Sequence, residues 1–157
     1  MRCITKILSV SITSTIGLYN KIIRFPSGEC SEVCIFQLPP YAQAKLVTVI
    51  KGKVLDVVVD IRSGSKTFGK VYYCTRDSEK RNMLMVPEGF AHGFSALEDT
   101  LFAYKCTNTY NLEVVGGIVW NDPDLRINWQ NESPIVSEKD SSLPTLAELM
   151  RKSVILQ

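Results

Sequence analysis

The feature that most constrains the fold is a series of short β-type segments that begins after Phe36. Runs rich in Val, Ile, Tyr and Phe are separated by turn residues such as Lys51-Gly52 and Pro87-Glu88-Gly89. We expect strands at Lys45–Ile50, Lys53–Ile61, Phe68–Thr75, Asn82–Val86, Gly93–Ala96 and Leu101–Cys106. Short strands at this spacing, punctuated by Gly and Pro, are typical of an all-β sandwich or barrel.

Two local patterns refine this prediction. Odd positions from Leu55 to Ile61 are apolar, whereas Asp56 and Asp60 fall on the opposite face of the same strand. Such a carboxylate face either is exposed to water or lines a cavity, and the pattern alone favours exposure.

Near the C-terminus, Thr145 and Glu148 form a capping box before an apolar stripe, which predicts a helix over Thr145–Arg151.

Composition excludes several classes of protein. The 157 residues suit one globular domain, and a net charge of +2 is too small to indicate a nucleic-acid or membrane surface. No stretch approaches the ~20 apolar residues of a membrane span. One histidine excludes a multi-histidine metal site, and five cysteines without a CxxC pair favour free thiols in a reducing cytoplasm.

Residues 1–35 differ from the rest of the chain. They hold three of the five cysteines and four basic residues, and Glu29 is their first acid. The remaining residues carry fourteen charges of each sign. A Ser-rich, acid-poor presequence is one explanation for this composition.

From Phe36 to Leu149, ordered motifs resemble those of the dTDP-4-dehydrorhamnose 3,5-epimerases. They read QLPPYAQAKLV (37–47), VVVDIRSGSKTFG (57–69), VPEGFAHGF (86–94), FAYK (102–105), GIVWNDP (117–123) and SEKD (137–140). The resemblance implies a cupin or jelly-roll barrel, a homodimer, and no metal or redox cofactor. It also implies a step of dTDP-L-rhamnose synthesis, in which a dTDP-4-keto-6-deoxy sugar is epimerised at C3 and C5.

The chemistry explains the residue types at the matching positions. A C4 carbonyl acidifies the C3 and C5 protons, so a base removes each proton and an acid returns one on the opposite face. By resemblance, Tyr104 is the acid and Asp140 orients the base, while Gln37, Lys45 and His92 contact the substrate. Without the resemblance, Tyr104 and His92 would be core residues, Lys45 a solvated strand lysine and Asp140 a turn carboxylate.

The family's base is a histidine that should stand at Ile35, with an arginine at Glu32. An isoleucine cannot take a proton, so the chain lacks its general base. The possible codons of residues 28–36 can also be read in a frame that begins at the third base of each codon. In that frame they permit Gly-Val-Leu-Arg-Gly-Leu-His-Phe, which is the family motif that contains the missing arginine and histidine. We therefore interpret residues 1–35 as an out-of-frame segment, with Met1 internal to a longer gene, and residues 36–157 as the epimerase-like domain.

Three function classes follow from this reading. The first is an epimerase whose reading frame is damaged, which we favour. The second is a catalytically inactive remnant that binds a nucleotide sugar. The third is a related cupin isomerase of dTDP sugars, which the motifs around Lys45, His92 and Tyr104 disfavour.

Overall fold

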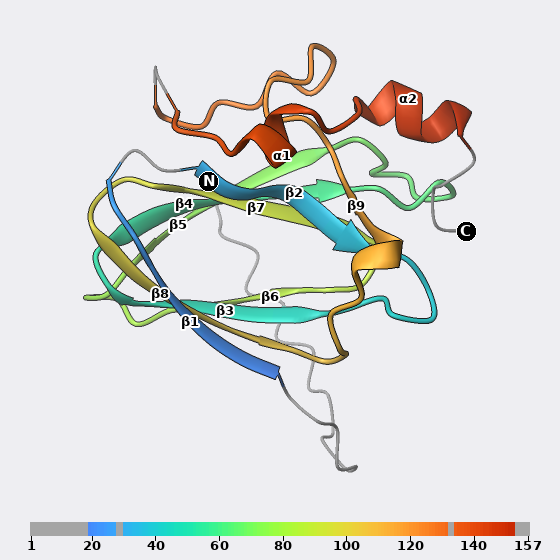
Figure 1. The fold of residues 1–157 in the computed structure, drawn as a ribbon. Coiled ribbons are helices and arrows are strands. Elements are labelled where there is room, and N and C mark those ends of the chain that lie inside the picture. The colour runs from blue at the N-terminus through green and yellow to red at the C-terminus, as the bar shows by residue number, and fades with distance from the viewer. Residues whose placement is uncertain (1–18, 28–29, 132–133, 153–157) are drawn as a thin grey trace.

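The structure is a computed structural model that describes residues 19–27, 30–131 and 134–152. Within them, the strands form two antiparallel sheets that face each other (Figure 1). The strands are β1 (Tyr19–Phe25), β2 (Cys30–Gln37), β3 (Lys45–Lys51), β4 (Lys53–Asp60), β5 (Val71–Asp77), β6 (Met83–Val86), β7 (Phe90–Ala96), β8 (Thr100–Cys106) and β9 (Val115–Gly117). A short 3₁₀ helix (Leu112–Val114) and two α-helices, α1 (Glu138–Ser141) and α2 (Leu146–Arg151), complete the elements.

The strand order is that of a rolled barrel rather than a meander. One sheet has the order β1-β8-β3-β6, and the other has the order β5-β4-β7-β2-β9. Strands distant in sequence therefore become neighbours, as in β1 beside β8 and β2 beside β7. The all-β prediction and the jelly-roll arrangement are confirmed.

The space between the sheets holds an apolar core. Phe94 stacks on Phe102 at 4.4 Å between ring centroids, and Phe25 meets Phe94 edge-on at 4.8 Å. Val47, Val49, Val54 and Ala96 complete this inner cluster. Aromatic rings bury large apolar areas, so these three rings fix how the sheets face each other.

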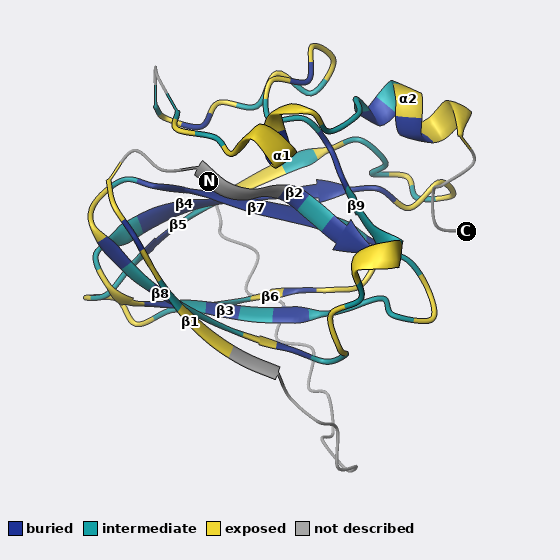
Figure 2. Ribbon diagram, in the orientation of Figure 1, coloured by how far each residue is buried: buried dark blue, intermediate teal, exposed yellow. Residues whose placement is uncertain are grey.

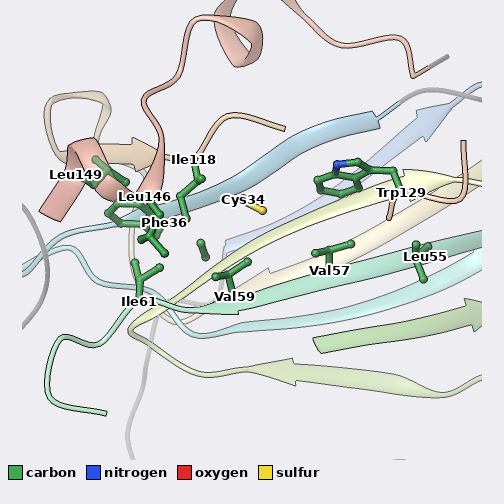
Figure 3. Packing of buried hydrophobic residues seen from close by; sticks show 11 residues of the cluster. Cys34, Phe36, Leu55, Val57, Val59, Ile61, Ile118, Trp129, Leu146 and Leu149 are labelled. Carbon is green, nitrogen blue, oxygen red and sulfur yellow. The ribbon is translucent and has the colours of Figure 1, made fainter. Parts of the chain in front are cut away.

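A second core lies on the outer face of the five-stranded sheet, where the C-terminal segment covers it (Figures 1 and 3). Leu55, Val57 and Val59 point from β4 towards Trp129, Leu146 and Leu149. Strand β4 is consequently buried on both faces (Figure 2). The predicted helix is confirmed as α2, which Thr145 caps through a complete capping box with Glu148.

The carboxylate face of β4 is not exposed to water, and that expectation is wrong. Asp56 and Asp60 are both fully buried, because the four-stranded sheet covers this face of β4. Each carboxylate has an arginine partner, Arg76 for Asp56 and Arg62 for Asp60. Pairing offsets the cost of removing the charges from water, which a pattern of alternation cannot reveal.

The barrel also begins before Phe36, where we expected its start. Strand β1 pairs with β8 along its whole length, and β2 pairs with β7 and β9. Phe25 and Cys34 are core residues, so part of the segment before Phe36 is packed into the barrel. The edge of β8 offers unpaired backbone groups that an extended segment satisfies. Residues 1–18 lie outside the described part of the chain.

Candidate functional site

A cavity of about 490 Å³ opens between the two sheets, beside the segment that carries α1. Strands β1, β2, β3, β8 and β9 contribute to its wall, as do two loops and α1. The residues around it are Lys21, Ile35, Phe36, Gln37, Gln43, Lys45, Tyr104, Cys106, Tyr110, Val115, Ser137, Lys139 and Asp140. Four of the five predicted site residues, Gln37, Lys45, Tyr104 and Asp140, therefore lie around one space.

Strand alternation brings the predicted residues to this wall. Cys34 and Phe36 belong to the outer core, so Ile35 and Gln37 project from the other face of β2. On the facing sheet, Tyr104 of β8 pairs with Val47 of β3, a buried residue of the inner core. Residues opposite each other on paired strands share a face, so Tyr104 projects into the barrel.

Ile35 occupies the position at which the resemblance places the base. It pairs with His92 on one side and with Gly117 on the other. A Cβ at Gly117 would lie 2.8 Å from Cδ1 of Ile35 and 2.8 Å from Cδ1 of Leu143. The absence of a side chain at Gly117 thus leaves room for Ile35 to lie towards Leu143, three residues beyond Asp140.

The residue before Ile35 supplies no base either. Cys34 is fully buried and adopts a positive φ of 45°, at a register shift in β2 between Ser31 and Ile35. Burial, aided by the nearby charge of Asp122, raises the pKa of the Cys34 thiol far above its usual range. The thiol stays protonated and faces the outer core, away from the cavity.

Asp140 is held at the cavity by the start of α1. Ser137 caps this helix, and its Oγ accepts a hydrogen bond from the Asp140 backbone N–H at 3.1 Å. The Asp140 residue is 9% exposed. A carboxylate at this place can orient a protonatable ring at position 35, as the resemblance implies for the missing histidine.

Gln37 is committed to the protein itself. Its Nε2 donates to the carbonyls of Tyr41 (2.6 Å) and Thr109 (3.0 Å), and its Oε1 accepts from the Asn111 backbone N–H (2.8 Å). These bonds fix the two loops that frame one end of the cavity. The structure thus gives Gln37 a part in shaping the wall, whereas its role as a substrate contact stays a prediction.

His92 is placed apart from the other four residues. It lies on the inner face of β7 but is 1% exposed and is not part of the cavity wall. Its Nε2 lies 2.8 Å from Oδ1 of Asp56. The structure brings His92 next to Ile35 by strand pairing, but it does not bring its side chain to the cavity surface as we expected.

Three lysines give the cavity a positive character. Lys21 and Lys139 are exposed near its rim, Lys45 is buried in its wall, and Asp140 is the one acidic residue around it among the described residues. A concave site with this balance attracts an anionic ligand such as a diphosphate. Sequence reasoning missed Lys21 and Lys139, because an isolated lysine gives no pattern that separates a site from an ordinary surface.

The described residues contain no group of three or more His, Cys, Asp and Glu side chains that could hold a metal ion. Around the cavity, the polar groups are hydroxyls, amides, amines, the Cys106 thiol and one carboxylate. This set suits hydrogen bonding and proton transfer to a polar, anionic molecule.

The chain is similar to proteins of one family over most of its length. The profile of the dTDP-4-dehydrorhamnose 3,5-epimerase family matches residues 34–148. An epimerase of this name from Sinorhizobium fredii is 47% identical over 116 residues, which are 73% of this chain and 60% of that protein. The Escherichia coli enzyme is 46% identical over 122 residues, covering 76% of this chain and 66% of that protein.

Solved structures give the same result. The Elizabethkingia anophelis epimerase superposes with a TM-score of 0.80 at 41% identity, covering 83% of this chain and 72% of that one. A Legionella pneumophila epimerase, solved in complex with dTDP-4-keto-L-rhamnose, gives 0.81 at 35% identity, covering 88% and 73%. The chain spans about 60% of the length of the first curated relatives it matches. With a profile match over most of its length and these close relatives, the chain belongs to the dTDP-4-dehydrorhamnose 3,5-epimerase family.

Proposed function

We propose that the cavity binds a dTDP-4-keto-6-deoxy sugar of dTDP-L-rhamnose synthesis, and that it keeps Lys45, Tyr104 and Asp140 of an epimerase site but lacks the general base. The observation that carries this proposal is the position of Ile35 in a wall shared with Lys45, Tyr104 and Asp140. The bound dTDP-4-keto-L-rhamnose of the Legionella relative supports the class of ligand. The positive rim formed by Lys21 and Lys139 suits its diphosphate.

Each wall residue has a role in the proposed reaction. A base at position 35 would take the C3 or C5 proton, and the electron pair would move to the C4 oxygen as an enolate. The Lys45 ammonium would stabilise that oxygen, because a cation lowers the energy of developing negative charge. Tyr104 would return a proton to the opposite face of the ring, and Asp140 would orient the base.

In the chain as written, Ile35 stops this sequence at its first step. The hydrocarbon side chain cannot accept a proton, so the enolate does not form even where its stabilising groups are present. We therefore propose a binding-competent protein without epimerase turnover.

We also propose that residues 1–35 are an out-of-frame reading of an epimerase gene. In support, the family profile begins at residue 34, and a register shift with a positive φ lies just before Ile35. Genomic DNA around codon 35 tests this directly. An intact in-frame gene of the sequence shown would contradict it, and a single extra base in the run near codon 36 would support it.

Binding tests the proposed ligand without relying on turnover. In titration calorimetry, the chain should bind dTDP-4-keto-6-deoxyglucose, and Lys45→Met should weaken binding by about 10–100-fold. Lys70→Met removes an exposed lysine that is not part of the cavity wall, so it should leave the affinity unchanged. No binding by the parent chain, or equal effects of the two substitutions, would contradict the proposal.

Restoring the base tests the reaction. Ile35→His alone should restore little exchange of the C3 and C5 protons, because Glu32 stands where the arginine belongs. A gene in which the codons of residues 28–36 are read in the shifted frame should exchange these protons about 10²–10⁴-fold faster than the present chain. In that restored protein, Tyr104→Phe should lower the rate of epimerisation. This result would distinguish a role of Tyr104 as the proton donor from a role in binding alone.

The remaining proposals concern assembly and location. We propose a homodimer formed through the outer face of the four-stranded sheet, where Ile22, Met83 and Met85 are 62%, 61% and 51% exposed. Ile22 and Met83 line a hollow of about 310 Å³. We propose a cytoplasmic location, which the free thiol of Cys34 suits. No helix in the described residues is long and apolar enough to cross a membrane.

A further inference from the structure

The carboxylate of Asp140 has no partner of its own in the cavity wall. Its backbone N–H donates to Oγ of Ser137, but its side chain takes part in no hydrogen bond or ion pair within the described part of the chain. The residue is only 9% exposed, and it lines the cavity. An ionised carboxylate removed from water without a donor is costly, so this group favours a ligand that supplies one.

Position 35 explains why the partner is missing. The resemblance implies that Asp140 orients a histidine ring at this position, and a ring N–H can donate to a carboxylate. Ile35 stands there instead, and α1 lies against β2 (Figure 1), so a hydrocarbon occupies this part of the wall. The replacement has left an acceptor without its donor.

The charges around the cavity are separated in space. Lys21 and Lys45 belong to β1 and β3 of the four-stranded sheet, whereas Asp140 lies in α1, against β2 of the five-stranded sheet. Lys139 is next to Asp140 in the chain, but it is exposed at the rim and forms no ion pair with it. A ligand complementary to both regions carries a negative group for the lysines and a positive group for Asp140. The cavity therefore matches a zwitterion better than a simple anion.

We propose that the cavity selects a dTDP sugar with an amine at C3, and that Asp140 binds the ammonium group. This inference rests on the proposed function, which places the diphosphate and the sugar in the cavity. Position 35 would face C3 and C5 of the sugar, and of these two carbons only C3 carries a hydroxyl. An ammonium in place of that hydroxyl supplies both the opposite charge and N–H donors, whereas a hydroxyl supplies a donor alone.

Two ligands that differ only at C3 test this selection. dTDP-3-amino-3,6-dideoxyglucose and dTDP-6-deoxyglucose share the nucleotide and lack the C4 ketone, so neither can enolise. In titration calorimetry at pH 7, the chain should bind the amino sugar about tenfold more tightly, because a charge-assisted hydrogen bond is stronger than a neutral one. Equal affinities, or tighter binding of the hydroxyl sugar, would overturn the proposal.

A matched pair of variants tests the residue. Asp140→Asn removes the charge but keeps the size of the side chain and the backbone contact with Ser137, and it should abolish the preference for the amino sugar. Glu138→Gln removes an exposed acid of the same helix that is not part of the cavity wall, so it should keep the preference. Binding of dTDP-6-deoxyglucose by Asp140→Asn verifies that this variant is folded. A preference that survives in Asp140→Asn, or that is lost equally in both variants, would contradict the assignment.

The Ile35→His variant distinguishes direct recognition from long-range attraction. A neutral ring at position 35 can donate to Asp140 and satisfy it without changing the charge of the site, so the preference for the amino sugar should fall. Attraction of the ammonium by distant charge alone would leave the preference as it is in the parent chain. That result would show that Ile35 has not freed the carboxylate.

The outcomes separate this inference from the proposed function. If both ligands bind with the same affinity, the selection by Asp140 fails and the proposed function stands. If neither ligand binds, and dTDP-4-keto-6-deoxyglucose does not bind either, the proposed function fails and the selection with it.

Discussion

Single residues decide both the chemistry and part of the stability of this barrel. Asp60 illustrates the second case, because its buried carboxylate accepts from Nε and Nη2 of Arg62 (2.9 and 2.7 Å) and from the hydroxyls of Ser65 (2.7 Å) and Thr67 (2.6 Å). Burial alone would raise the pKa of Asp60, but these hydrogen bonds outweigh it and hold the pKa well below its usual range. The carboxylate thus favours the folded state only while it is ionised.

The sign of the pH dependence follows from that lowered pKa. A carboxyl with a depressed pKa in the folded state contributes stability above its unfolded pKa of about 3.9, and this is lost as the pH falls. We expect Asp60→Asn to lower the free energy of unfolding by about 1–3 kcal/mol at pH 7. Chemical denaturation at pH 7 and pH 3 should show a smaller difference between the two proteins at pH 3. A constant difference would contradict the assignment.

At the scale of elements, the local pattern of apolar and turn residues predicted the strands that can be recognised from their own sequence, without knowledge of their partner strands. Strands β3, β4, β6 and β8 match the expected ranges to within a residue, because runs of apolar and β-branched residues bounded by turn residues mark them. Strand β9 has three residues and forms because it pairs with β2. In β2, the register shift interrupts the alternation of side chains between the two faces of the strand. Lys45, Tyr104 and Asp140 could be found from ordered motifs, whereas the burial of Asp56 depends on a partner twenty residues away.

One carboxylate joins the C-terminal elements together. The 1%-exposed Asp122 accepts from the backbone N–H groups of Asp124 (2.9 Å) and Leu125 (3.0 Å), and from that of Leu146 in α2 (2.8 Å). We expect Asp122→Ala to cost about 3 kcal/mol and Thr145→Ala, which removes the cap of α2, about 1 kcal/mol. Thermal unfolding should therefore show a clearly larger fall in Tm for Asp122→Ala. Equal falls would mean that Asp122 does not anchor α2.

At the scale of the whole molecule, the two faces of the four-stranded sheet differ in purpose. Its inner face contributes to the core and the cavity, while its outer face leaves Ile22, Met83 and Met85 exposed. Apolar patches of this kind mark interaction sites on soluble proteins. Sedimentation analysis should show a dimer for the parent chain and a monomer for Met83→Lys/Met85→Lys. A monomeric parent chain would contradict the proposed assembly.

The central claim is that the barrel retains an epimerase cavity in which Ile35 has replaced the base. The most direct measurement is deuterium incorporation at C3 and C5 of dTDP-4-keto-6-deoxyglucose, incubated in D₂O with the 157-residue chain. We predict incorporation no faster than in a sample without protein, under conditions where calorimetry shows the sugar nucleotide bound. Rapid incorporation at either carbon would show that another residue acts as the base, and would contradict the role assigned to position 35.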